Sequence, residues 1–164
     1  MPFVNNNQRD GFSSNSLVGK DFENFAFIYF MKKERIVLEK NFEIKLGVGL
    51  KKVHRFDFGS KSEKIIVECK SHTWTNGNNI PSAKISVWNE AMFYFNLAPK
   101  KYKKCFFVLR SICEKRHKTL LQYYIEKYCH FISKDIIFYE YCLENGHCEI
   151  YNFERIENIF KKQK

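Results

Sequence analysis

Residues 54–70, HRFDFGSKSEKIIVECK, decide the fold expected for this chain. The last part of the stretch, IIVECK at residues 65–70, is rich in β-branched side chains, which predicts a strand. Successive side chains of a strand point to opposite faces, so Glu68 and Lys70 share a face with Ile66. We therefore expect a carboxylate and an amine side by side on one face of an apolar strand.

A second strand and a turn are predicted just before it. Residues 53–58, VHRFDF, favour a strand, and the polar segment GSKS at 59–62 is typical of a turn. A hairpin folded at that turn brings Asp57 beside Glu68 and Lys70. Two carboxylates and a lysine would then converge at one end of a two-stranded ribbon.

Composition predicts a single domain with a basic surface. The chain has 164 residues, of which 45% are hydrophobic, enough for a substantial core. Its net charge of +10 favours a polyanionic partner, nucleic acid before membrane, although a lysine-rich composition without a specific partner is the alternative. The sequence shows no apolar run of membrane-spanning length and no signal peptide, so we expect a cytoplasmic protein. The six cysteines form no C-x-x-C pair, which predicts reduced, mostly buried thiols.

The rest of the chain alternates helical and strand patterns around this hairpin. We expect a flexible N-terminal tail over residues 1–15 and one domain over 16–164. The expected elements are a helix at 16–33, a strand at 42–47, the two strands above, a polar loop at 71–81, a helix at 82–97, a strand at 105–109, a helix at 118–131, strands at 135–142 and 148–153, and a short tail or helix at 156–164. This order predicts an α/β (α+β) fold with a mixed central β-sheet flanked by helices.

In this order and spacing, the chain resembles the PD-(D/E)XK nuclease superfamily over roughly residues 16–109. The family motif is an Asp near the end of the second core strand and Asp/Glu-x-Lys on the third. Asp57 and Glu68-Cys69-Lys70 match it, with Phe56 where the family often has proline. The resemblance implies a restriction-endonuclease-like αβββαβ core. It also makes Glu23, on the first helix, a candidate for the glutamate that many members carry there.

A helix feature of some family branches is matched only in part. Those branches have Gln-x-x-x-Tyr on the helix after the motif, where this chain has Glu90 and Tyr94. Glu for Gln puts membership of those branches in doubt. A solvated Glu90 and a core Tyr94 are the other interpretation.

The residue types suit metal-assisted phosphodiester hydrolysis. Mg²⁺ prefers oxygen ligands, which Asp57, Glu68 and the backbone carbonyl of Cys69 would supply, and Mn²⁺ could replace it. Lys70 would orient or deprotonate the attacking water and offset charge in the transition state. Glu23 would hold a metal-bound water or a second ion. The alternative is a surface salt-bridge cluster, but three charges at the end of an apolar ribbon favour a catalytic site.

The loop at 71–81 and its surroundings are expected to contact nucleic acid. Lysine, arginine and histidine can follow the phosphate backbone, asparagine can recognise adenine edges, and tryptophan can stack on a base. The other interpretation is an ordinary polar loop with its tryptophan packed beneath it. The candidate nucleic-acid-binding residues are Arg55, His72, Trp74, Asn76, Asn78 and Lys84.

Together these features predict a Mg²⁺-dependent DNA endonuclease of the restriction-enzyme type. We expect duplex DNA as the substrate and a homodimer if both strands are cut. A structure-specific nuclease such as a Holliday-junction resolvase is the first alternative, and a non-catalytic nucleic-acid-binding domain is the second. RNA stays open as a substrate.

Overall fold

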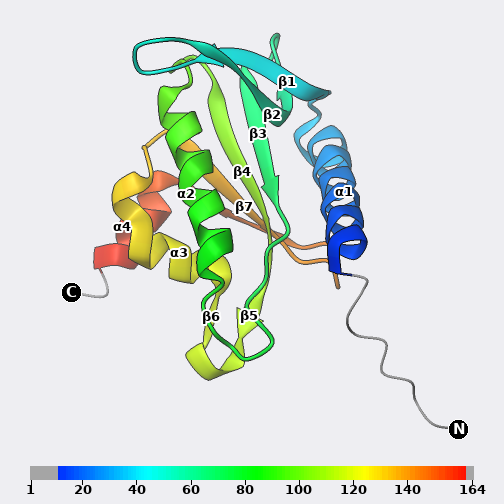
Figure 1. The fold of residues 1–164 in the computed structure, drawn as a ribbon, viewed down its shortest axis with the longest axis vertical. Helices are drawn as coiled ribbons and strands as arrows, with labels where there is room; N and C mark the ends of the chain where they lie inside the picture. Colours follow the sequence, from blue (N-terminus) through cyan, green and yellow to red (C-terminus); the bar gives the residue numbers. More distant parts are fainter. Residues whose placement is uncertain (1–10, 162–164) are drawn as a thin grey trace, which may run out of the picture.

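The computed structural model describes residues 11–161 of the chain. Within these residues the protein has a mixed α+β fold, a six-stranded mixed sheet with helices on both faces (Figure 1). The strand order is β1-β2-β3-β4-β7-β8. The strands are β1 (Glu39–Leu46), β2 (Lys52–Ser60), β3 (Ile65–Lys70), β4 (Lys103–Leu109), β7 (Ile136–Tyr141) and β8 (Cys148–Tyr151). The predicted fold class is confirmed.

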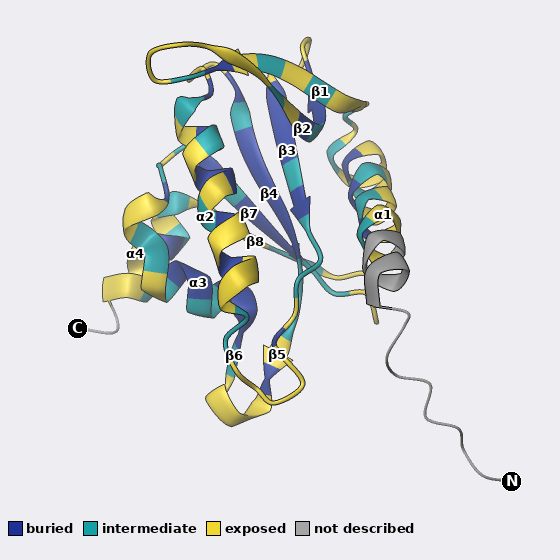
Figure 2. Ribbon diagram, in the orientation of Figure 1, coloured by how far each residue is buried: buried dark blue, intermediate teal, exposed yellow. Residues whose placement is uncertain are grey.

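The centre of the sheet is parallel and its margins are antiparallel. β4 pairs in parallel with β3 and β7, while β1–β2, β2–β3 and β7–β8 are antiparallel. The apolar segment expected as a central strand, residues 105–109, lies within β4 and is almost wholly buried (Figure 2). Parallel strands need long crossover connections, and helices provide them here.

Helices cover the two faces unequally. α1 (Gly11–Tyr29), continued by a π-helical turn (Phe30–Glu34), lies on one face, and α2 (Ser82–Leu97), α3 (Leu120–Tyr128) and α4 (Phe153–Lys161) lie on the other (Figure 1). Each face has its own hydrophobic core, because side chains alternate along every strand. Among the described residues, no helix has the length and apolarity needed to cross a membrane.

α1 begins at Gly11, five residues before the predicted start, and the part of the predicted tail at residues 1–10 lies outside the described residues. Its buried stripe is Phe22, Ala26 and Phe30, spaced four residues apart. Val18 and Phe25 follow the same helical spacing of apolar residues, but both are exposed. Residues four apart lie on one face of a helix, and this set is the part of it that is fully buried. Phe27 and Tyr29 also contact aromatic rings of the sheet, but both are only half-buried.

α2 has the predicted bounds. Its buried stripe consists of Ile85, Trp88, Met92 and Phe95, which recur at helical spacing. Phe93, between the last two, is 54% exposed.

The region before α3 holds a small hairpin that the sequence did not predict. β5 (Ile112–Cys113) and β6 (Lys118–Thr119) pair antiparallel and form a separate two-stranded sheet. The predicted helix therefore begins later, at Leu120, where Thr119 forms a capping box with Gln122. Strands of two residues are too short to leave a periodic pattern.

In the β2–β3 hairpin of residues 54–70, the turn lies later in the chain than predicted. Gly59 and Ser60, predicted in the turn, belong to β2, and the turn comprises residues 61–64.

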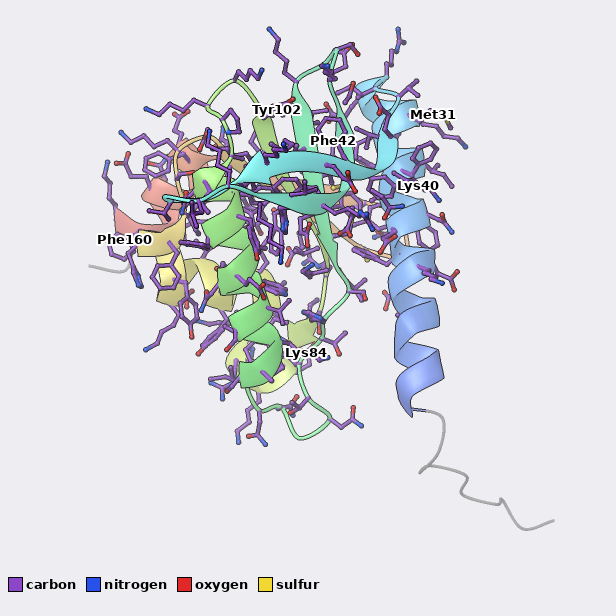
Figure 3. The ribbon with its side chains drawn as sticks, turned by 45° about the horizontal axis from the view of Figure 1, so that its top comes forward. Met31, Lys40, Phe42, Lys84, Tyr102 and Phe160 are labelled. Carbon is purple, nitrogen blue, oxygen red and sulfur yellow. The ribbon has the colours of Figure 1, made fainter. Side chains whose placement is uncertain are left out.

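A Cβ atom at Gly59 would lie 2.3 Å from the ring of Phe42 on β1, so the strand pair accepts only glycine without moving that ring. Phe42 in turn packs against Tyr102 (Figure 3), which anchors the β1–β2 hairpin to the body of the domain.

Candidate active site

The candidate site begins where β2 separates from β3. Pairing between the two strands ends at Phe58 and Val67. Beyond that pair, the Cys69 amide donates a hydrogen bond of 2.7 Å to Oδ2 of Asp57. Phe56 packs in one core and Phe58 in the other, although side chains two residues apart ordinarily share a strand face, so β2 departs from regular alternation at Asp57. The Asp57 carboxylate thus takes the place of a strand partner and is held at the fork between the strands.

Glu68 and Lys70 form an ion pair beside this fork. Lys70 Nζ lies 2.5 Å from Glu68 Oε1, and each side chain is 15% exposed. The other carboxylate oxygen, Oε2 of Glu68, is buried and has no hydrogen-bond partner in the described part of the chain. A buried oxygen without a partner is costly, and a cation would satisfy it.

The electrostatics of the pair follow from this burial. Burial raises the pKa of Glu68, Lys70 works against the shift and Asp57 adds to it. Burial alone would lower the pKa of Lys70, but the charges of Glu68 and Asp57 outweigh it and hold that pKa above its usual value. Lys70 is therefore a stable cation beside these carboxyl groups.

These residues adjoin an open cleft of about 590 Å³ between α1 and α2. Asp57, Cys69 and Lys70 line it, and Glu23 of α1 faces it from the opposite wall. Burial and the charge of Asp57 raise the pKa of Glu23, which places this carboxyl within electrostatic reach of Asp57. Glu68 itself does not line the cleft. The structure therefore brings together three of the four predicted catalytic residues in the cleft, with Glu68 tied to them through Lys70.

The donor set suits one hard dication. Among residues 11–161, no three side chains of histidine, cysteine, aspartate or glutamate are grouped to hold a metal ion. Mg²⁺ commonly takes only one or two carboxylates and completes its shell with water and substrate phosphate. Asp57, Glu68 and the Cys69 carbonyl have oxygens of the type that Mg²⁺ takes, and Oε2 of Glu68 has no hydrogen-bond partner among the described residues.

The predicted nucleic-acid-binding residues divide into two groups. His72, Trp74, Asn76 and Lys84 line the cleft, with Lys84 near the start of α2 (Figure 3). Arg55 and Asn78 do not line it, and both have other contacts. Arg55 pairs with Glu43 across the β1–β2 hairpin at 2.6 Å, and Asn78 shapes the loop with a left-handed φ of 58°.

Trp74 is buried, so it lies beneath the loop and is not displayed on it. Its side chain is 6% exposed, and its ring packs edge-on against Tyr123. Its backbone amide donates to Oγ of Ser111, which fastens the loop after β3 to the end of β4. Arg116 lies over the indole ring. In this structure Trp74 supports the cleft wall, as the second interpretation of the loop proposed, and its ring is not free to stack on a base.

Glu90 and Tyr94 lie outside the cleft. Tyr94 stacks on His54 of β2 with ring centroids 3.6 Å apart, and Glu90 is exposed. Burial lowers the pKa of His54, while the charge of Glu90 opposes that shift. Glu90 is thus solvated, as the structural interpretation has it, and Tyr94 joins α2 to the hairpin but is half-buried and does not lie in the core.

Sequence reasoning missed several residues of the cleft. Ser71 and Thr73 line it next to Lys70, and Gly19 and Val87 line its helical walls. Hydroxyls directly after the E-x-K pattern were a signal that could have been used. Ser111 left no such signal, because it meets Trp74 across 37 residues of sequence.

Comparisons of the chain with protein-family models, curated proteins and solved structures give no match.

Proposed function

We propose that this protein is a divalent-metal-dependent nuclease that hydrolyses phosphodiester bonds in DNA, and that it is a member of the PD-(D/E)XK superfamily. One observation carries the proposal. Asp57, held by the Cys69 amide, adjoins a buried Glu68–Lys70 pair that has an unsatisfied carboxylate oxygen, at the side of an open cleft. A basic chain with a net charge of +10 is suited to a polyanionic substrate.

Each residue has a defined part in the proposed chemistry. Asp57, Glu68 and the Cys69 carbonyl would hold Mg²⁺ or Mn²⁺, which when bound polarises a phosphoryl oxygen and acidifies a water. Lys70, kept charged by the neighbouring carboxylates, would orient the attacking water and offset negative charge on the phosphate. Glu23, facing from α1, would accept a hydrogen bond from a water in the cleft.

The arrangement of the cleft supports a nucleic-acid backbone as the ligand. Exposed Lys84 stands on one wall and Asn76 on the adjoining loop. Phosphate contacts from such residues provide affinity without sequence information. Within residues 11–161, one cleft is lined by Asp57 and Lys70, so cutting both strands of a duplex at one place would require two copies. We therefore retain the homodimer as part of the proposal, to be measured by light scattering coupled to size-exclusion chromatography.

A cleavage assay tests the proposal. Purified wild type would be incubated with Mg²⁺ or Mn²⁺ and with plasmid, linear duplex, single-stranded DNA, a four-way junction or RNA. We expect duplex DNA to be cut, and Lys70→Met and Asp57→Asn to reduce the rate by at least about a hundredfold. Lys127→Met on α3 and Glu39→Gln on β1 remove exposed charges elsewhere and should leave the rate unchanged.

The substrates separate the competing functions. Discrete plasmid fragments would support restriction-type cleavage, and cutting confined to the four-way junction would identify a junction resolvase instead. Binding of DNA without cleavage of any substrate, in either metal, would contradict the enzyme and support a binding domain. Cleavage that persists in Lys70→Met and Asp57→Asn would place the active site elsewhere.

A further inference from the structure

A hydrogen bond between α2 and the loop after β3 determines the state of a cleft histidine. Nε1 of Trp88 donates to Nδ1 of His72 at 2.9 Å. An indole nitrogen can only donate, so Nδ1 of His72 must be the acceptor and must lack a proton. Trp88 is wholly buried in the core, and its indole ring also packs edge-on against Phe106 and Tyr124. The donor is therefore rigid, and it fixes the orientation of the imidazole ring.

The other ring nitrogen of His72, Nε2, is available to a ligand in the cleft. A neutral imidazole with an unprotonated Nδ1 has its proton on Nε2. Nε2 of His72 makes no hydrogen bond to a residue in the described part of the chain. It is also not one of the fully buried side-chain nitrogen and oxygen atoms that lack a hydrogen-bond partner. His72 lines the cleft, close in sequence to Lys70. The Nε2–H group is thus a free, oriented donor on the cleft wall.

The surroundings keep this donor uncharged. Burial, followed by the charges of Lys84 and Lys70, lowers the pKa of His72 to about 4. The tautomer argument does not depend on that value, since it follows from the donor-only indole. A neutral donor adds hydrogen-bond direction without adding to the repulsion among the cleft cations.

We propose that His72 is a phosphate-binding residue of the cleft, whose Nε2–H donates to a non-bridging oxygen of a nucleic-acid backbone, with Trp88 as the residue that positions it. This rests on the proposed function, because it takes nucleic acid as the ligand. Lys84 contributes charge to the same backbone, and His72 contributes direction. The two contacts differ in one measurable respect, which is their dependence on salt.

The first experiment examines the tautomer without any ligand or activity. Long-range ¹⁵N–¹H NMR spectra of the full-length protein at pH 7 should show His72 as the neutral Nε2–H tautomer. The same state should persist to about pH 5, because the pKa of His72 lies near 4. Trp88→Phe should abolish the tautomer preference. Observation of the Nδ1–H tautomer, or of an imidazolium at pH 6, would overturn the proposal.

The second experiment measures affinity for a labelled 30-base-pair duplex in Ca²⁺ over a range of salt concentrations. His72→Phe should weaken binding about tenfold, as expected for loss of a hydrogen bond to a charged group, with an unchanged slope of log affinity against log salt. Lys84→Ala should reduce that slope by about one. His72→Gln, which has an amide donor of similar reach, should recover part of the affinity, and His147→Gln on an exposed turn should match wild type.

The outcomes separate this inference from the proposed function. If wild type binds DNA and His72→Phe binds it equally well, the proposed role of His72 is wrong while the nuclease proposal stands. The same conclusion holds if His72→Phe reduces the slope of log affinity against log salt, because that would show an ionic contact. If wild type binds no nucleic acid, both fail. Retained far-ultraviolet circular dichroism and recovery in His72→Gln exclude misfolding as the cause of a loss.

Discussion

At the scale of single residues, Asp57 serves the fold and the candidate chemistry together. Its carboxylate accepts the Cys69 amide where the β2–β3 ladder has ended. Without it, a backbone donor in a half-buried position would lose its partner. The same carboxylate raises the pKa of both Glu23 and Glu68. One side chain therefore maintains the strand geometry and also the negative charge that a metal ion would neutralise.

Two substitutions separate these roles. Asp57→Ala should lower the free energy of unfolding by about 1–2 kcal/mol, because the Cys69 amide loses its acceptor. Asp57→Asn retains an amide oxygen that can accept the same bond, so its stability should stay within about 0.5 kcal/mol of wild type while cleavage is lost. Urea unfolding in metal-free buffer measures both. Equal stability of Asp57→Ala and wild type would show that the hydrogen bond is unimportant.

At the scale of elements, the β1–β2 hairpin depends on a close approach between two strands. The Phe42 ring occupies the space over Gly59, and the Phe42–Tyr102 contact continues this packing to the residue just before β4. His54 and Tyr94 stack between the same hairpin and α2. The hairpin is therefore tied to the sheet at one end and to a helix along its length, which positions Asp57 at the fork.

Gly59→Ala tests the close approach. The added methyl would lie 2.3 Å from a Phe42 ring atom, so we expect a loss of about 1–3 kcal/mol in the free energy of unfolding. Gly49→Ala is the matched control, because nothing lies within 4 Å of its would-be Cβ. Thermal and urea denaturation measure the difference. In a double-mutant cycle, Phe42→Ala should relieve most of the cost, and additive losses would contradict the steric explanation.

A second connection between elements is the ion pair of Lys104 and Asp135. It joins β4 to the turn before β7 at 2.5 Å, with Lys104 nearly buried and Asp135 about one-third exposed. Ser133 also donates to Asp135. Burial would raise the pKa of Asp135, but hydrogen bonds from Lys104 and Ser133 outweigh it, so the pKa is lowered.

Asp135→Asn should therefore cost about 2 kcal/mol near neutral pH, less than for a fully buried pair because Asp135 keeps contact with water. A lowered carboxyl pKa gives stability that is present above the unfolded-state value of 3.8 and is lost as the pH falls through the folded-state value. The difference from wild type should thus shrink below pH 4. Unfolding free energies at several pH values measure it, and a difference independent of pH would contradict an electrostatic origin. The double variant Lys104→Met/Asp135→Asn should regain stability.

At the scale of the whole molecule, charge is distributed unevenly. The chain has a net charge of +10, yet the cleft brings together the carboxyls of Glu23 and Asp57 beside the Glu68–Lys70 pair. A polyanion is attracted by the surface as a whole and repelled by these carboxylates at close range. A divalent cation would remove this conflict.

Metal removal should therefore weaken DNA binding, and neutralising the carboxylates should replace the metal. We expect wild type in EDTA to bind a labelled duplex at least about tenfold more weakly than in Ca²⁺ at equal ionic strength. Asp57→Asn/Glu68→Gln should bind equally well in both conditions. Fluorescence anisotropy measures the affinities. Stronger binding by metal-free wild type than by the double variant would contradict this account.

Local patterns were sufficient for much of the fold. The bounds of α2, the central strand at 105–109 and the two strands on either side of Asn145-Gly146 follow from periodicity and turn chemistry over a few neighbouring residues. The mixed α+β class follows from their order. The pairing of Asp57 with the Glu68–Lys70 strand was also predictable, because a short turn leaves two antiparallel strands little choice of partner.

The sequence by itself thus determined which residue types stand on which strand, and so the candidate chemistry. Only the tertiary structure decided the rest. It buried Trp74 against Tyr123, left Arg55 outside the cleft, and set Trp88 against His72. Those contacts join residues 12 or more positions apart, and their partners are selected by the packing of whole helices, strands and loops. Interactions among neighbouring residues specify a strand or a turn. They do not select a distant partner, so a distant contact forms only when the surrounding elements pack together.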